Sequence, residues 1–350
     1  MNASEIIIQR LYNQQIAETD CTKPTGLVSK LVAMQSQVWD MGKWAIGLRL
    51  RGITNEDVEE AYNKGEILRT HVLRPTWHFV TPADIRWLLK LTSPRVHAFN
   101  APYYRKMELD AAIFRKANAI CRKSLIGGKQ LNRLVLRDIF TKNKIKTNDI
   151  RLTLLLMQAE LDGLICSGAR EGKQFTYALL DERAPGNESY HRDEALGTLV
   201  QRYFVTRGPA TVNDFTWWSG LTVKDAKEGL AMHKTLLNSE KVKGAEYFFK
   251  ASSLGSAKKI HATFLLPDYD EYGISYKDRS LFMNAFTLFN RKKKYPHTII
   301  LNGVAGGTWT RDQKKKQLLI KSSFFEPLSK SRQSVFDKAV QNYLSFFTAT

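Results

Sequence analysis

Residues 211–225, TVNDFTWWSGLTVKD, contain the start signals of two helices separated by one glycine. At each start a threonine is followed three residues later by an aspartate, which is the pattern of a capping box. Gly220 is expected to end the first helix, so the pattern predicts helices at residues 212–219 and 223–233 joined by a tight turn. Two short helices in this arrangement are typical of a helix-turn-helix.

A similar pattern, helices followed by two strands, is predicted twice in the preceding part of the chain. In the first copy Thr54 caps a helix, and Arg74-Pro75 interrupts the strands that follow. In the second copy Thr147 is predicted to cap the later helix, and a basic turn at 168–173 joins the strands. The expected elements are helices at residues 5–16, 55–63, 131–142 and 148–162, an apolar helical stripe at 27–34, and strands at 67–80, 164–167 and 175–180.

The third copy follows a linker at residues 181–189 and begins with a helix at 194–204. Short strands are predicted at 247–249, 261–266, 298–301 and 303–310, before a closing helix at 336–347. The predicted fold class is therefore α+β, with tandem winged-helix modules followed by a β-rich C-terminal region. The predicted boundaries are 1–110, 111–183 and 190–245 for the three modules and 246–350 for the C-terminal region.

The charge of the chain favours a polyanionic partner. The 350 residues carry a formal net charge of +19, and the basic residues are spread along the whole chain. Nucleic acid is the first candidate and an anionic membrane surface the second, while a merely basic protein is the alternative without a ligand. The N-terminus lacks the pattern of a signal peptide, and no apolar run is long enough to span a bilayer. We therefore expect a cytoplasmic, nucleoid-associated protein without a membrane partner.

The common signatures of metal and cofactor sites are missing from the sequence. The three cysteines, Cys21, Cys121 and Cys166, form no CxxC pair and no zinc spacing, and reduced thiols are the simplest interpretation. No P-loop, dinucleotide fingerprint or metalloprotease motif is present. No cofactor and no bound metal are therefore predicted.

Three carboxylates gather at residues 268–271. Asp268, Asp270 and Glu271 could hold a metal or form a general acid/base pair. The alternative is a turn whose acids face solvent or pair with arginines such as Arg279. We favour the alternative.

Two glutamines, Gln35 and Gln37, flank Ser36 after the first apolar stripe. Residues two apart do not share a helix face, so joint action requires an extended or turning backbone. A carboxamide does not titrate and cannot act as a strong base, but it can orient a water molecule. Such a pair is sufficient for hydrolysis only if the substrate already carries a good leaving group.

Several residues are candidate DNA contacts because of their charge and position. Alternation along a strand places Thr76 and His78 on one face and Trp77 on the other. A lone strand histidine is more often structural than catalytic, and the pair Trp217-Trp218 is expected in the core. The predicted DNA contacts are Arg74, Thr76 and His78 on the first wing, Arg170 and Lys173 on the second, and Lys224 and Lys227 in the recognition helix.

The order of several motifs resembles the AlkZ-like winged-helix DNA glycosylases, over nearly the whole chain. The first two motifs are Met34-Gln35-Ser36-Gln37 and residues 73–78, LRPTWH. The others are residues 202–204, RYF; 208–211, GPAT; 214–215, DF; 217–221, WWSGL; 265–267, LLP; 270–272, DEY; and 307–309, GTW.

This resemblance implies excision of alkylated purines from double-stranded DNA and, in some members, the unhooking of interstrand crosslinks. The Gln-x-Gln motif of the family corresponds to Gln35 and Gln37, whereas a sister group has Gln-x-Asp. At Pro75 and Trp77 relatives often have smaller or aliphatic residues. A purine alkylated at N7 or N3 is cationic, so its glycosidic bond is already weak, and the enzyme must mainly place a water and stabilise an oxocarbenium ion. A monomer is expected.

Two other functions remain open from the sequence. A non-catalytic winged-helix DNA-binding protein or transcriptional regulator would suit the modules and the charge equally well, although regulators normally dimerise on palindromes. A metal-dependent nuclease or hydrolase would instead use Asp268, Asp270 and Glu271.

Overall fold

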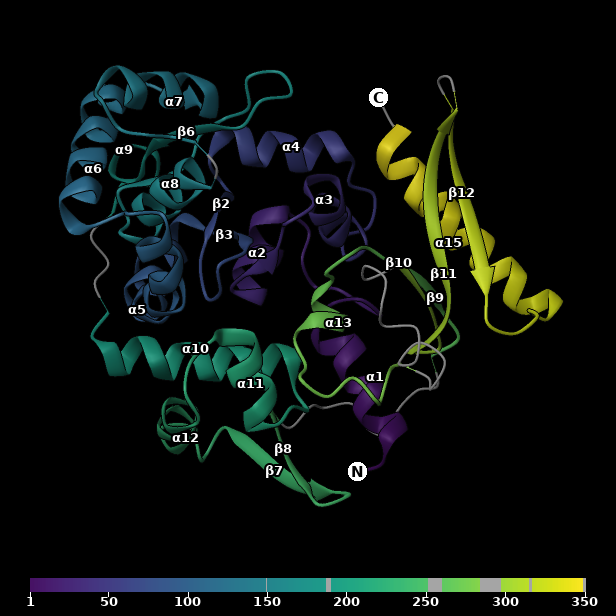
Figure 1. Cartoon of the computed structure of the whole chain (residues 1–350). Helices are drawn as coiled ribbons and strands as arrows, with labels where there is room; N and C mark the ends of the chain where they lie inside the picture. Colours follow the sequence, from purple (N-terminus) through teal and green to yellow (C-terminus); the bar gives the residue numbers. More distant parts are fainter. Residues whose placement is uncertain (149, 187–189, 251–259, 284–296, 315–316, 349–350) are drawn as a thin grey trace.

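Three units with a similar element order make up most of the molecule (Figure 1). The computed structural model describes all residues except 149, 187–189, 251–259, 284–296, 315–316 and 349–350. The first two units run helix, strand, helix, helix, strand, strand, and the third has the bridge residue Ala210 in place of the first strand. The strands of each unit pair antiparallel. The molecule is thus a mixture of helices and strands, as the sequence predicts.

The first unit carries the two glutamines. Its elements are α2 (Pro24–Leu31), β1 (Met34–Gln35), α3 (Trp39–Gly47), α4 (Asn55–Lys64), β2 (Leu68–His71) and β3 (Trp77–Val80). The strands form one sheet in the order β1-β3-β2. Thr54 caps α4 with a full capping box, and Gly65 ends it in the left-handed conformation. The predicted cap at Thr54 is confirmed.

The second unit is joined to the first by a long helix, α5 (Pro82–Lys106). Its elements are α6 (Ala111–Leu125), β4 (Leu131–Asn132), α7 (Arg133–Lys142), α8 (Arg151–Leu161), β5 (Ile165–Ser167) and β6 (Thr176–Leu179), followed by the short helix α9 (Leu180–Arg183). The prediction that Thr147 caps the later helix is wrong, because α8 begins after Ile150 without a side-chain cap.

The third unit confirms the two helix starts at residues 211–225. Its elements are α10 (Arg192–Arg207), α11 (Val212–Ser219), α12 (Val223–Ala231), β7 (Leu237–Val242) and β8 (Ala245–Lys250). Thr211 and Thr222 both form capping boxes, and Gly220 ends α11 with a φ of 73°. Ala210 bridges to Phe248, so the segment before α11 pairs with β8 as a strand would.

The C-terminal region is a sheet with helices beside it. Its elements are β9 (Thr263–Leu266), α13 (Glu271–Ile274), β10 (His297–Leu301), β11 (Val304–Lys314), β12 (Gln317–Phe324) and α15 (Lys330–Thr348). The strand order is β12-β11-β10-β9, and α1 (Ala3–Asn13) lies near this region (Figure 1). Two runs of basic residues, RKKK at 291–294 and KKK at 314–316, fall wholly or partly outside the described residues.

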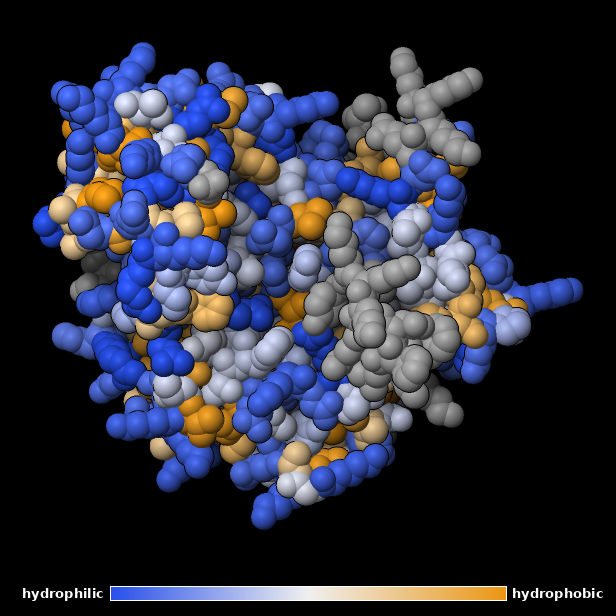
Figure 2. Space-filling model, in the orientation of Figure 1, coloured by the Kyte–Doolittle hydropathy of each residue, from blue (hydrophilic) through white to orange (hydrophobic). Residues whose placement is uncertain are grey.

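The first unit lies between the other parts of the molecule. One hydrophobic core joins it to the third unit through side chains such as Leu68 and Phe215. A second core joins it to the C-terminal sheet and α15 through Trp44 and Tyr343. Hydrophilic residues cover most of the face seen in Figure 2, with small hydrophobic patches between them. The motif glutamines therefore belong to the unit against which the third unit and the C-terminal region pack.

In the part of the chain that the structure describes, none of the helices has both the length and the apolar character that a membrane span requires.

Candidate functional site

The backbone is extended at Gln35 and bends at Gln37, and their joint action requires an extended or turning backbone. Gln35 is the last residue of β1 and pairs directly with His78 of β3. The pairing continues one residue further, because the Ser36 N–H donates to the Trp77 carbonyl at 2.8 Å. Gln37 follows two residues later, where the chain bends, and its side chain reaches back to the backbone of β3. We call the face that carries Gln35 and His78 the glutamine face.

The glutamines differ in exposure. Gln35 is 8% exposed, whereas Gln37 is exposed and its Oε1 accepts from the Trp77 N–H at 3.2 Å. One carboxamide therefore lies at the surface with a fixed orientation, and the other lies just beneath it. A group that enters from solvent would meet Gln37 first.

A buried arginine holds the backbone between the glutamines. The Arg69 guanidinium donates from Nε and Nη2 to the Ser36 carbonyl, at 3.1 and 3.0 Å. It lies 4.3 Å from the centroid of the Trp77 ring and 4.8 Å from that of Phe175. Burial lowers the pKa of Arg69 to about 10, which still leaves it charged at neutral pH. Sequence reasoning missed this residue.

A buried carboxylate holds the glutamine strand from the other side. Glu271 Oε1 accepts from the Gln35 N–H at 2.9 Å. Its Oε2 accepts from Arg207 Nη2, Trp218 Nε1 and Ser275 Oγ, at 2.8, 2.9 and 2.8 Å. Glu271 thus connects β1 with α10, α11 and the C-terminal region, so that the site is assembled from distant parts of the chain.

The charge of Glu271 is stabilised by its partners. Burial alone would raise the pKa of this carboxyl, but the charge and the hydrogen bond of Arg207 outweigh burial, and the pKa falls to about 2. A carboxylate held in this state is a fixed anion under physiological conditions. Its role is to position the strand, and it is not available as a general acid.

The acidic cluster does not form a metal site. Asp270 is paired with Arg49 through two hydrogen bonds of 2.8 and 2.9 Å, and Glu271 with Arg207. Asp268 lies 3.1 Å from His297. The prediction of arginine-paired acids is confirmed, with Arg49 and Arg207 as the partners. No cluster of metal ligands occurs among the described residues.

The predicted contacts of the first wing are largely enclosed. His78 is fully buried, and Arg74 Nε and Nη2 and Thr76 Oγ1 are buried atoms. His78 is therefore enclosed, Arg74 and Thr76 are half-buried, and their contact with DNA stays a prediction.

The other predicted contacts fall into two groups. Arg170 packs on Trp39 and Phe175, with ring centroids at 5.3 and 4.8 Å. Lys173, Lys224 and Lys227 are exposed. Arg170 and Arg69 both pack on Phe175, which brings Arg170 close to the glutamine segment. Lys224 and Lys227 lie on α12, which packs against α10 (Figure 1).

The tryptophan pair is divided between core and surface. Trp218 is fully buried, as predicted. Trp217 is 43% exposed, so its prediction as a core residue is wrong, and its Nε1 donates to the Ile274 carbonyl at 3.0 Å.

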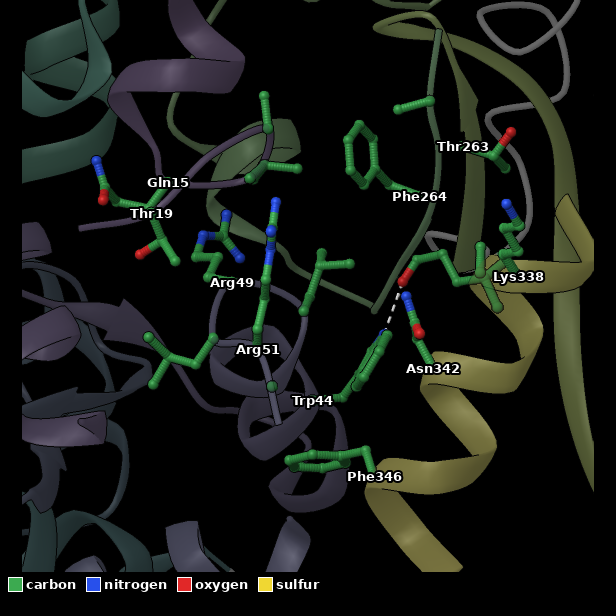
Figure 3. Close-up of a pocket in the computed structure, with 18 of the residues that line it drawn as sticks. Gln15, Thr19, Trp44, Arg49, Arg51, Thr263, Phe264, Lys338, Asn342 and Phe346 are labelled. Carbon is green, nitrogen blue, oxygen red and sulfur yellow. Dashed lines mark hydrogen bonds between the residues drawn. The ribbon is translucent and has the colours of Figure 1, made fainter. Parts of the chain in front are cut away.

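A cavity of about 610 Å³ lies between α3, β9 and α15, away from the glutamines (Figure 3). Trp44, Phe264 and Phe346 line it together with Arg51 and Lys338. Trp44 Nε1 donates to the Leu265 carbonyl at its edge, at 2.7 Å. Neither motif glutamine contributes to the lining, so the cavity is separate from the candidate site.

Comparison with known proteins connects this geometry with DNA repair. A family model described as "DNA glycosylase AlkZ-like" matches residues 28–346. An interstrand DNA cross-link repair glycosylase of Streptomyces sahachiroi is 22% identical over 227 residues, which are 62% of this chain. The match spans 60% of the length of that relative.

The solved structure of Streptomyces sahachiroi DNA glycosylase AlkZ has a similar fold. The TM-score is 0.79, with 99% of this chain and 96% of the other chain covered at 18% identity. At this identity the likeness shows the fold alone.

Proposed function

The chain belongs to the AlkZ-like DNA glycosylase family, and on this premise we propose that it hydrolyses the N-glycosidic bond of alkylated, cationic purines in double-stranded DNA. The observation that carries the proposal is the segment at Gln35 and Gln37, where both residues border strand β3 beside a buried polar network. The unhooking of interstrand crosslinks, named for the Streptomyces relative, is part of the same proposal.

The chemistry matches what carboxamides can do. The bond between C1′ and the purine breaks with its electron pair going to the base, which neutralises the cation. The sugar is left as an oxocarbenium ion, and a water attacks C1′ and loses one proton. Gln35 and Gln37 orient that water and turn carbonyl oxygens toward the developing positive charge, and such preorganised dipoles are usually the largest catalytic effect. No group that protonates the leaving base is required.

The repeated units support a DNA-binding scaffold. The order helix, strand, helix, helix, strand, strand of the first two units is that of a winged helix, and the third unit differs only in having a bridge residue in place of the first strand. We propose three such modules at 1–110, 111–183 and 190–245, with a β-rich region at 246–350. The exposed lysines Lys173, Lys224 and Lys227 are the proposed phosphate contacts. Binding as a monomer is proposed, because a scaffold of three modules can contact the duplex without a second copy. A regulator without activity is disfavoured by the family match.

The test is a gel assay of abasic-site formation. A duplex with one N7-methylguanine is incubated with the protein in the presence of a chelator and then cleaved with alkali. Wild type is compared with Gln35→Ala/Gln37→Ala and with Gln341→Ala, a matched change at an exposed glutamine on α15. Scission by wild type and Gln341→Ala but not by the double variant is the expected result. Equal scission by all three would refute the role of the glutamines.

A further inference from the structure

A row of three polar side chains crosses the sheet on the glutamine face. The strand register places Gln35 opposite His78 and His78 opposite Thr70. Side chains of directly opposed residues lie on the same face, with Cβ atoms about 4.5–5.5 Å apart. The side chain of His78 is therefore the neighbour of the Gln35 carboxamide on the inner side of the sheet.

One nitrogen of His78 has its role fixed by the backbone. Its Nδ1 lies 2.9 Å from the Thr76 carbonyl oxygen, which can only accept a hydrogen bond. Nδ1 must therefore carry the proton, and in the neutral ring Nε2 is a bare acceptor. Burial and the positive charge of Arg74 lower the pKa of His78 to about 3, against the opposite effect of Glu271, so the ring is neutral at physiological pH.

The other ring nitrogen, Nε2, has no hydrogen-bond partner in the described part of the protein. Among the residues that the structure describes, His78 Nε2 and Thr70 Oγ1 are buried atoms without a hydrogen-bond partner. Native proteins rarely leave such atoms unsatisfied, and water is the usual partner where protein supplies none. His78 Nε2 lacks a partner next to Gln35, and Thr70 Oγ1 lacks one on the opposite side of His78, so a water molecule can be held along this row.

We propose that His78 is a positioning residue of the glycosylase reaction, whose Nε2 accepts a hydrogen bond from the attacking water that Gln35 also binds. The inference rests on the proposed function and names a third member of the water site. With its hydrogens on His78 Nε2 and on the carbonyl oxygen of Gln35, the water directs a lone pair at C1′.

The proton balance of this step is closed. Water forms the new bond to C1′, while the base has left with the electron pair of the broken bond. The oxygen is then positively charged and strongly acidic, and it releases its proton to solvent water, while Nε2 serves only to orient the attacking molecule. Because proton loss follows bond formation, an acceptor that cannot be protonated is sufficient to orient the water.

This reasoning yields a test with matched variants. Glutamine places a carbonyl oxygen near the position of Nε2, whereas leucine has no acceptor. Single-turnover rates on the N7-methylguanine duplex are measured for wild type, His78→Gln and His78→Leu, with DNA affinity and far-ultraviolet circular dichroism as controls. The expected rates are within about fivefold of wild type for His78→Gln and lower by about 10- to 100-fold for His78→Leu, with unchanged DNA affinity. An unimpaired His78→Leu, or a folded His78→Gln as slow as His78→Leu, would overturn the proposal.

If His78→Leu does not fold, a measurement on wild type tests the same proposal. In ¹⁵N-histidine NMR, His78 is expected to show a protonated Nδ1 and a bare Nε2 whose resonance shifts when a duplex with a cationic pyrrolidine abasic-site analogue binds. The opposite tautomer overturns the inference. Because this readout needs no turnover, it distinguishes an error about His78 from a failure of the proposed glycosylase activity, which inactivity of wild type would reveal.

Discussion

At the scale of single residues, Glu271 explains how two uncharged side chains can form a site. A carboxamide has little influence of its own on where it points, so its backbone must be fixed from outside. Glu271 does this from one side through the Gln35 N–H, and Arg69 does it from the other through the Ser36 carbonyl. The precision of the site is therefore supplied by charged residues that never meet the substrate.

Glu271→Gln should be strongly destabilising, because it leaves the charge of Arg207 buried without a counterion. Breaking a buried ion pair in this way costs about 3–5 kcal/mol. Urea unfolding measures the loss, and Glu194→Gln, at an exposed position on α10, is expected to change stability by less than about 0.5 kcal/mol. Equal stability of the two variants would contradict the ion-pair role.

The same pair predicts a dependence on pH. The folded-state pKa of Glu271, about 2, lies below its ordinary value of 4.5, so the ionised carboxylate stabilises the fold. This contribution is complete above pH 4.5 and is lost as the pH falls toward 2. The stability difference between wild type and Glu271→Gln should accordingly shrink over that range. A stability difference that grows as the pH falls would contradict a lowered pKa of Glu271 in the folded state.

Arg69→Lys should impair catalysis more than binding. Lysine keeps the charge but lacks the fork that holds the Ser36 carbonyl, so the glutamine segment becomes less precisely placed. A displacement of this kind is expected to lower the single-turnover rate by about 10- to 100-fold. The control is Arg137→Lys, whose side chain is 47% exposed. An unchanged rate with Arg69→Lys would show that the hydrogen bonds from Arg69 to the Ser36 carbonyl do not affect catalysis.

At the scale of elements, the turn between α11 and α12 requires glycine. Gly220 has a φ of 73°, and an added Cβ would lie 2.6 Å from the Leu73 carbonyl oxygen. Gly220→Ala should therefore destabilise the protein by about 1–3 kcal/mol. Gly26→Ala, inside α2 with nothing within 4 Å of the new carbon, should instead stabilise it by about 0.5–1 kcal/mol. Thermal unfolding of both variants checks the contrast in sign.

Helix α12 carries a matched pair of opposite charges for testing DNA contact. The Nζ of Lys224 lies 3.8 Å from the Glu228 carboxylate, one turn away. Lys224→Gln should weaken binding to duplexes of any sequence and reduce the salt slope by about 1. Glu228→Gln should strengthen binding, since it removes a repelling charge from the same surface. Anisotropy titrations at several salt concentrations measure the DNA affinity of both variants. Unchanged affinity in both would show that α12 does not contact DNA.

The elements differ in how far sequence alone predicts them, for physical reasons. The helices at 212–219 and 55–64 begin with side-chain caps and end at glycines, and these local signals determined their limits. Helix α3 was missed because it begins after Val38 without a side-chain cap and contains two glycines. Helix α8 begins without a side-chain cap, and Thr147 misled the prediction.

At the scale of the whole molecule, the site depends on contacts that no local pattern contains. Gln35 and Gln37 were identified by family resemblance, and the structure meets the condition of an extended or turning backbone, being extended at Gln35 and bent at Gln37. The Gln35–Glu271 hydrogen bond spans 236 residues, and the clamp by Arg69 spans 33. The sequence showed Glu271 only as one acid of a cluster, because its partners are brought to it by the packing of three separate regions.

The net charge of +19 predicts strongly salt-dependent DNA binding. Each phosphate neutralised by a lysine or arginine releases counterions, so the logarithm of the association constant should fall linearly with the logarithm of the salt concentration, by about 0.9 per contact. Titrations between about 50 and 200 mM salt should show a loss of at least about tenfold. A flat response would mean that the basic surface does not face the duplex.

The link between Gln35 and Glu271 also sets the order of events during synthesis. The ribosome delivers Gln35 among the first residues, but the carboxylate that receives its N–H emerges only 236 residues later. A nascent chain or an N-terminal fragment would carry the motif glutamines without the anchor that orders their strand. The proposed ability to open a glycosidic bond should thus arise only after Glu271 has been synthesised.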